Sequence, residues 1–135
     1  MGAWAAFGTI HRMTKPLGIA AATFGASAVA LGAFGAHALR SRLEPAAIEI
    51  WHTAVEYQFW HALVLTALAL ASTRLRFAHV AASAFTLGIV LFCGSLYALA
   101  LGAPHAVGIV TPFGGVALIA GWLALLGGWC SATTK

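Results

Sequence analysis

The sequence has little charge of either sign. Charged residues make up 7% of its 135 residues, whereas hydrophobic residues make up 61%. A soluble domain carries about 25% charged residues, because its surface must face water. This composition excludes a soluble globule and predicts an all-α integral membrane protein whose main partner is the lipid bilayer.

Acidic residues are the scarcest group. There is no Asp, and the three glutamates (Glu44, Glu49 and Glu56) all lie in the stretch from residue 44 to 61. Without Asp a Ser–His–Asp triad is excluded, and three carboxylates are too few for a di-iron bundle site. The sequence also lacks the G-x-S-x-G, H-E-x-x-H and phosphate-binding glycine motifs, so neither an enzyme nor a bound cofactor is predicted.

Cysteine is nearly absent as well. Cys93 and Cys130 are the only two, with no C-x-x-C spacing. Cys93 falls in the middle of an apolar segment and Cys130 at the end of another. Their depths should differ by more than the ~7 Å that a disulfide can bridge between Cα atoms, so no disulfide is predicted.

Four apolar segments are long enough to cross a bilayer as helices. The predicted spans are residues 17–39, 52–73, 80–101 and 113–130, which form one membrane domain over residues 17–135 after an N-terminal arm of residues 1–16. Residues 45–56 are predicted to start the second helix at the membrane interface, with Trp51 and Trp60 in the aromatic belt. A signal peptide ending near Ala36-His37-Ala38 is the alternative for the first segment, but the segment is longer than a usual signal-peptide core.

The net charge of +4 is carried by residues that flank these segments. No basic stripe with interleaved aromatic residues is present, so nucleic acid is not a predicted partner. With four spans both termini lie on one side, together with Arg12, Lys15, Arg74, Arg76 and Lys135, whereas Arg40 and Arg42 lie opposite. The positive-inside rule then predicts that the N- and C-termini are cytoplasmic.

Small residues recur every seven positions in three of the segments. Such seams let helix backbones approach closely in lipid and predict an antiparallel four-helix bundle with crossings near 20°. The predicted helix-packing positions are Gly18, Gly25, Gly32, Gly35, Gly88, Ser95, Gly114, Gly121 and Gly128.

Four stretches resemble a known family: ALGAFGAH (30–37), EYQFWHAL (56–63), LFCGSLYALAL (91–101) and VTPFGGVALIAGW (110–122). Together they are similar to the bacterial "domain of unknown function 423" family, whose eukaryotic relatives are called transmembrane protein 256. The resemblance implies a small four-span inner-membrane protein without an established biochemical function. The recurring polar residues of the family fall on His37, Glu56, Tyr57, Gln58 and His61. Its aromatic signatures include Tyr97 and Trp122.

These polar residues form the candidate site. His61 lies inside an apolar run, Tyr57 precedes it by one helical turn, and His37 ends the first span on the same membrane side. The cluster can serve as hydrogen-bonding glue between helices, or as a functional group inside the membrane. Glu49, His52 and Glu56 share a helix face that could ligate a metal, or that could simply be a solvated surface with charge pairing.

The function that these features favour is structural. The sequence predicts an accessory protein that packs with itself or with a membrane partner through its small-residue seams. The alternative is a binding or transport module for a proton, a metal ion or a small amphiphile such as a quinone, with His37, Glu56, Tyr57 and His61 as the binding cluster.

Overall fold

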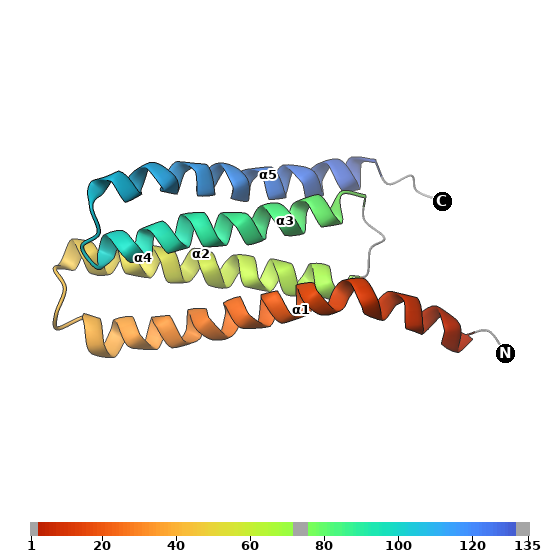
Figure 1. Ribbon diagram of the computed structural model, residues 1–135, viewed down its shortest axis with the longest axis horizontal. Coiled ribbons are helices and arrows are strands. Elements are labelled where there is room, and N and C mark those ends of the chain that lie inside the picture. The colour runs from red at the N-terminus through yellow and green to blue at the C-terminus, as the bar shows by residue number, and fades with distance from the viewer. Residues whose placement is uncertain (1–2, 72–75, 132–135) are drawn as a thin grey trace.

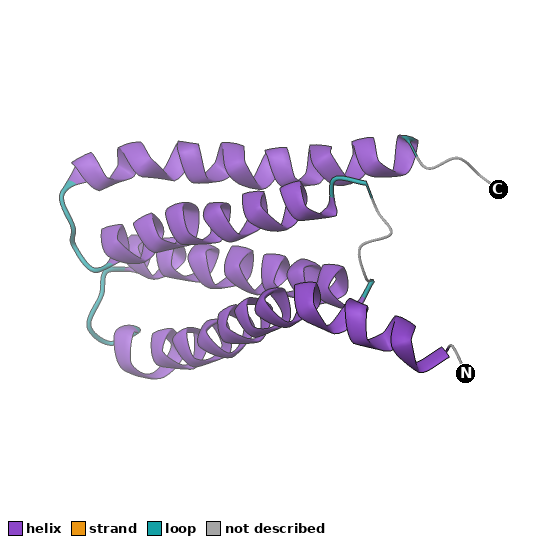
Figure 2. Ribbon diagram, turned by 45° about the vertical axis from the view of Figure 1, so that its right-hand side comes forward, coloured by secondary structure: helices purple, strands orange, loops and turns teal. Residues whose placement is uncertain are grey.

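The computed structural model describes residues 3–71 and 76–131, with side chains from Lys15 onward. Arg74, Lys135, the side chain of Arg12 and the end of the predicted span 52–73 lie outside the described residues. All regular structure in the described ranges is helical (Figures 1 and 2), so the all-α prediction is confirmed. The elements are α1 (Ala3–Phe34) with a π-helical end (η1, Gly35–Leu39), α2 (Pro45–Leu70), α3 (Ala78–Gly88), a π-helical segment (η2, Ile89–Cys93), α4 (Gly94–Ala100), a 3₁₀ turn (η3, His105–Ile109) and α5 (Val110–Cys130).

Proline marks where two of the helices begin. Glu44 is extended, with a ψ of 150°, and Pro45 follows as the first helical residue of α2. Pro112 lies in the first turn of α5. Proline fits both places because the first-turn N–H groups have no partner inside the helix. Pro16, by contrast, lies inside α1, so the residues of the predicted arm and those of the first predicted span share one helix.

Helices α1 and α2 run antiparallel, α3, η2 and α4 form one continuous rod that runs antiparallel to α2, and α5 runs antiparallel to that rod (Figure 1). Helix α2 is central, because it contacts α1, α3, η2 and α4, whereas α3 and η2 pack against α5. The main core lies among α2, α3, η2 and α5, and its largest fully buried side chains are Leu65, Phe85 and Cys93. A second core at the other end of α2 is formed by Leu39, Trp51 and Ala100.

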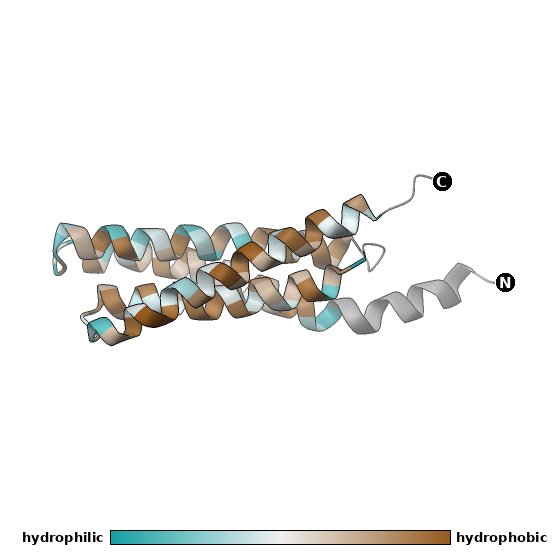
Figure 3. Cartoon of the chain, turned by 90° about the horizontal axis from the view of Figure 1, so that it is seen from above, coloured by the Kyte–Doolittle hydropathy of each residue, from teal (hydrophilic) through white to brown (hydrophobic). Residues whose placement is uncertain are grey.

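Hydrophobic residues occur along the length of the helices, interspersed with hydrophilic ones mostly toward the end away from the termini (Figure 3). In the part of the chain that the structure describes, three segments are long and apolar enough to cross a membrane: Lys15–Leu39, Ala78–Ala100 and His105–Cys130. Large hydrophobic side chains such as Val29, Val116 and Leu126 are more than half exposed, as expected of side chains that face lipid. Helix α2 does not reach the same apolar composition, because Glu49, His52, Glu56, Gln58 and His61 interrupt it.

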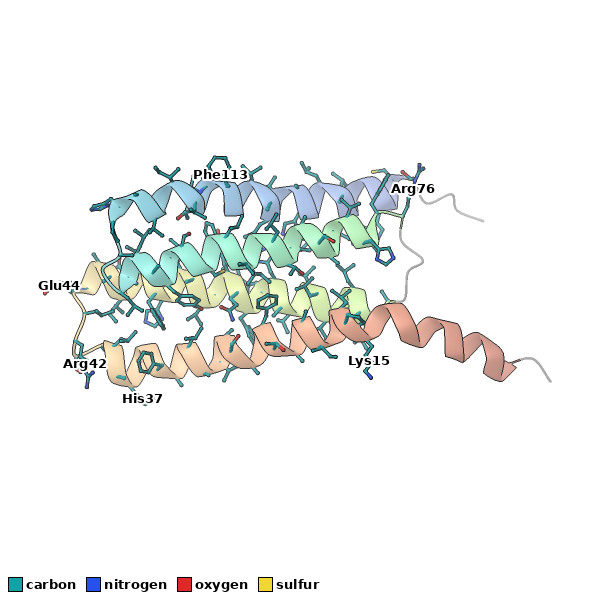
Figure 4. All side chains as sticks on the ribbon, viewed as in Figure 1. Lys15, His37, Arg42, Glu44, Arg76 and Phe113 are labelled. Atoms are coloured by element: carbon teal, nitrogen blue, oxygen red, sulfur yellow. The ribbon has the colours of Figure 1, made fainter. Side chains whose placement is uncertain are left out.

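Charged side chains gather at the two ends of the molecule. Figure 4 shows Lys15 and Arg76 at one end and His37, Arg42 and Glu44 at the other. This distribution leaves a long uncharged middle, broken on the surface by Glu56.

Four glycines line the contact of α5 with α3, η2 and the turn before α3. A Cβ on Gly114 would overlap the backbone N and Cα of Phe92, and one on Gly88 would overlap Leu118. At Gly121 a Cβ would come within 2.6 Å of the Phe85 ring. These distances are far below any van der Waals separation, so the helices approach as closely as they do because the side chains are missing. Gly128 meets the Arg76 carbonyl in the same way.

The α1–α2 contact is looser at its glycines. A Cβ on Gly32 would lie 3.3 Å from Val55, and one on Gly25 would lie 3.9 Å from Ala62. Nothing lies within 4 Å of the Cβ position of Gly18. Gly35 is the exception, because its Cβ would come within 2.6 Å of the Trp51 indole nitrogen.

Candidate functional site

Gln58 lies at the centre of a buried polar network. Its side-chain amide donates to the carbonyl oxygen of Phe24 at 2.9 Å and to the hydroxyl of Ser27 at 2.7 Å. Its carbonyl oxygen accepts a bond from the Tyr97 hydroxyl at 3.0 Å. One side chain on α2 therefore uses both amide hydrogens and its oxygen to join α1 and α4.

Trp51 makes a second link between α2 and α1. Its indole N–H donates to the Leu31 carbonyl at 2.9 Å, and its ring lies 4.7 Å from that of Tyr97. The expectation that Trp51 belongs to an aromatic belt is wrong, because only 2% of its surface is exposed. Tryptophan suits a buried position as well as the membrane interface, provided that a neighbouring group accepts a hydrogen bond from its indole N–H. Trp60, the other predicted belt residue, is 52% exposed.

His61 connects α2 with α5. Its Nδ1 lies 2.7 Å from the carbonyl oxygen of Tyr57, and its Nε2 lies 3.3 Å from the indole nitrogen of Trp122. A carbonyl only accepts and an indole N–H only donates, so the ring proton is assigned to Nδ1 and the lone pair to Nε2. Both nitrogens of a neutral imidazole are thereby satisfied within the chain. The Phe85 ring packs beside the imidazole at 5.4 Å.

A cleft of about 390 Å³ opens beside His61, between α2 and α5. Its walls are mostly aromatic and come from Tyr57, Trp60, His61, Phe92 and Trp122, with Leu118 at one side. The Tyr57 ring lies 4.8 Å from that of Phe92 and 5.3 Å from that of Trp60. A cavity of this size, mostly apolar with a few polar groups, is typical of small-molecule sites.

Two members of the predicted cluster lie apart from this network. Because Gly35 packs on Trp51 and the helices are antiparallel, His37 lies near the level of Glu49. His61 is then about 18 Å further along α2, at about 1.5 Å per residue. His37 is exposed at the end of the molecule (Figure 4). Glu56 is exposed and lies about 200° around the helix from Gln58, on the opposite face of α2.

The predicted metal-binding face is also exposed. Glu49, His52 and Glu56 all lie on the surface of α2. Within residues 15–71 and 76–131, no group of three or more His, Cys, Asp or Glu side chains is placed to hold a metal ion. Cys93 is a buried free thiol, and Cys130 is an exposed one.

Sequence reasoning missed the partners of the network. Ser27, Tyr97 and Trp122 supply the groups that bind Gln58 and His61, yet the family resemblance assigns no role to Tyr97 or Trp122. One available signal is that hydroxyl and indole groups in an apolar helix need hydrogen-bonding partners. A buried Gln and a buried His on the facing helix are the natural candidates.

The polar core and the apolar surface describe a membrane protein and identify no reaction. A sequence profile described as "Protein of unknown function (DUF423)" matches residues 31–115. The chain belongs to the DUF423 family. The matched region includes the Gln58 and His61 centres and the Tyr97 partner, and it ends before Trp122.

Named relatives of this DUF423 chain are membrane proteins without an assigned activity. It is 44% identical over 98 residues to a "UPF0382 membrane protein" of Haemophilus influenzae, which covers 72% of this chain and 79% of the relative. It is 44% identical over 112 residues to the "UPF0382 inner membrane protein YgdD" of Escherichia coli, covering 82% and 86%, and 41% identical over 102 residues to YwdK of Bacillus subtilis, covering 73% and 83%. No solved structure matches the chain. This DUF423 protein is thus a multi-pass protein of the inner membrane.

Proposed function

We propose that this DUF423 protein is a structural or accessory protein of the inner membrane, which packs with itself or with a membrane partner. One observation carries the proposal. Among the described residues, every buried side-chain nitrogen and oxygen has a hydrogen-bonding partner inside the chain. The polar core is therefore occupied in joining helices, as expected of interhelical glue in lipid.

In this proposal α2 is the fourth membrane crossing and the fold is an antiparallel four-helix bundle. The support is positional. Helix α2 contacts helices of two of the apolar spans, and its His61 lies 3.3 Å from Trp122 of the third. The termini are cytoplasmic, because Lys15 and Arg76 share one end of the molecule and the sequence adds Arg12, Arg74 and Lys135 to the same flanks.

The outer face of α1 is the surface best suited to a protein partner. Ala22, Ala26 and Ala33 are exposed on it, and Gly18 faces open space. Small side chains at a lipid-facing surface let another helix approach closely and gain dispersion contacts.

Gentle extraction from native membranes, followed by native mass spectrometry, tests the accessory role. We expect a stoichiometric oligomer or a reproducible complex, with photo-crosslinks from position 26 on α1 and none from position 119 on the outer face of α5. A strict monomer that crosslinks equally weakly from both positions would contradict the proposal.

The cleft beside His61 supports a second candidate, a binding module for a small amphiphile such as a quinone. Its aromatic walls suit a flat ring, and an apolar groove of about 270 Å³ that shares Trp122 continues along α2 and α5. The test is lipid mass spectrometry of the purified protein and of its His61→Ala variant. A folded variant that has lost a bound species favours the module, and a variant that has lost only stability favours the structural role.

A further inference from the structure

Glu56 is a carboxylate on the outer surface of the protein, deep in the expected membrane. Gly25 of α1 packs at Ala62 and Gly32 at Val55, so Glu56 lies close to the level of residue 31. The middle of the candidate span Lys15–Leu39 is only about 6 Å away, at about 1.5 Å per residue. Half of the hydrocarbon core is about 15 Å thick. This register puts Glu56 nearer the middle of the span than the predicted interfacial start at residues 45–56 implies.

Within the described residues the side chain of Glu56 makes no ion pair and no hydrogen bond, and it is exposed. Lys15 and Arg76 lie toward one end of the packed helices and Arg42 at the other (Figure 4), and Arg40 directly follows η1, two residues before Arg42. An ionisable side chain in the hydrocarbon region is costly unless it is paired, and such residues mark functional contacts.

A groove of about 340 Å³ runs beside Glu56 between α1 and α2. Its α1 wall is built mainly from small residues, Ala28, Gly32 and Ala33, and its α2 wall includes Phe59 and Trp60. A wall of small residues allows the backbone of a further helix to come close. The groove thus combines a surface of small side chains, on which a helix can pack closely, with one carboxyl group at a defined depth.

We propose that this groove receives a transmembrane helix of another membrane protein, which carries a lysine or arginine near its middle and pairs it with Glu56. The proposal rests on the accessory role and specifies the chemistry of the partner. Charge complementarity argues against a second copy. In a symmetric parallel dimer the Lys and Arg residues of both copies lie at the helix ends, and the groove would bring Glu56 against Glu56.

Reconstitution with synthetic helices tests this pairing without a cellular partner. The protein, with a photo-crosslinking amino acid in place of Phe59, is placed in phosphatidylcholine vesicles with Leu/Ala peptides about 20 residues long. One peptide has a central arginine and its twin has leucine there. We expect the arginine peptide to crosslink about tenfold more than its twin, a ratio within the range of interhelical polar pairs.

Two variants serve as matched comparisons. Glu56→Gln keeps the size of the side chain and should abolish the preference for the arginine peptide, whereas Glu49→Gln, an exposed acid near the start of α2, should keep it. Equal yields from the two peptides, or a preference that survives Glu56→Gln, would overturn the proposal. A crosslink between two protein copies through position 59, lost in Glu56→Gln, would assign the groove to a dimer and overturn it as well.

The vesicle and native-membrane experiments together test the Glu56 site separately from the accessory role. An arginine preference in vesicles, with a protein that is a strict monomer in native membranes, would support the site and contradict the accessory role. A native complex that forms equally well with Glu56→Gln would support the accessory role and overturn the site.

Discussion

The two helix pairs of this protein, α1–α2 and α3–α5, use the same small residues in different ways. Between α3 with η2 and α5, glycines bring backbone against backbone, as where Gly114 meets Phe92. Between α1 and α2 the glycines leave more room, and the helices are joined instead by Gln58 and Trp51, which donate to carbonyls of α1. A heptad repeat of glycine and alanine therefore predicts that two helices lie close together. Whether their backbones touch or their side chains form hydrogen bonds depends on the residues of the facing helix.

The largest effect is expected at Gly114, where an added Cβ would overlap a neighbouring backbone. Gly114→Ala places a methyl group on the Phe92 backbone, which cannot move without shifting η2. We expect a loss of about 3 kcal/mol in the free energy of unfolding, at the upper end of overpacking effects. Gly115→Ala is the matched control, because its Cβ would lie 3.8 Å from the Phe92 ring. Unfolding in mild detergent, monitored by circular dichroism, measures the stability of both variants. Equal losses of stability in Gly114→Ala and Gly115→Ala would contradict the close backbone contact at Gly114.

An intermediate effect is expected at the polar link of the other pair. Gln58→Leu replaces the amide with an apolar side chain of similar size. It leaves the Tyr97 hydroxyl without its acceptor. We expect the protein to lose about 1–2 kcal/mol of stability, in line with a lost interhelical hydrogen-bond network. The same unfolding assay tests it. A change smaller than that of an exposed control, Thr53→Ala, would show that the network does not hold the pair together.

The smallest effect is expected at Gly18. Its Cβ position meets nothing within 4 Å, so Gly18→Ala adds a helix-favouring residue without a clash. We expect stability to be unchanged or to rise by up to about 1 kcal/mol. Clear destabilisation in the same assay would mean that Gly18 is in contact with another helix, and the seam of α1 would then resemble that of α5.

Much of the architecture follows from the sequence because lipid allows few solutions. Four apolar segments and their flanking charges predict helices close to those observed, and Glu44-Pro45 marks the start of α2 correctly. The π-helical segments η1 and η2 were not predictable. Their hydrogen bonds span one residue more than those of an α-helix, and no residue type in the sequence marks this change. At η1 the backbone N–H of Arg40 donates to Gly35 at 3.1 Å, five residues back.

The candidate site was predicted only in part. Gln58 and His61 are buried and bonded across helices. The helix period places Glu56 on the opposite side of α2 from Gln58, but it could not show which side is buried or that His37 is far along the axis. The position of His37 depends on the register of α1 against α2, which the Trp51–Gly35 contact and the hydrogen bonds of Trp51 and Gln58 to α1 fix.

The polar side chains of α2 have a consequence for biogenesis. In the proposed four-crossing topology each newly made helix partitions from the translocon into lipid, and α2 is the one that falls short of the apolar composition of the three candidate spans. Its Gln58 finds its acceptors, the Phe24 carbonyl and the Ser27 hydroxyl, on the helix synthesised just before it. We therefore expect α1 and α2 to enter the bilayer as a hairpin, which a glycosylation-tag insertion assay on α2 with and without α1 would detect. Efficient insertion of α2 alone would contradict this order.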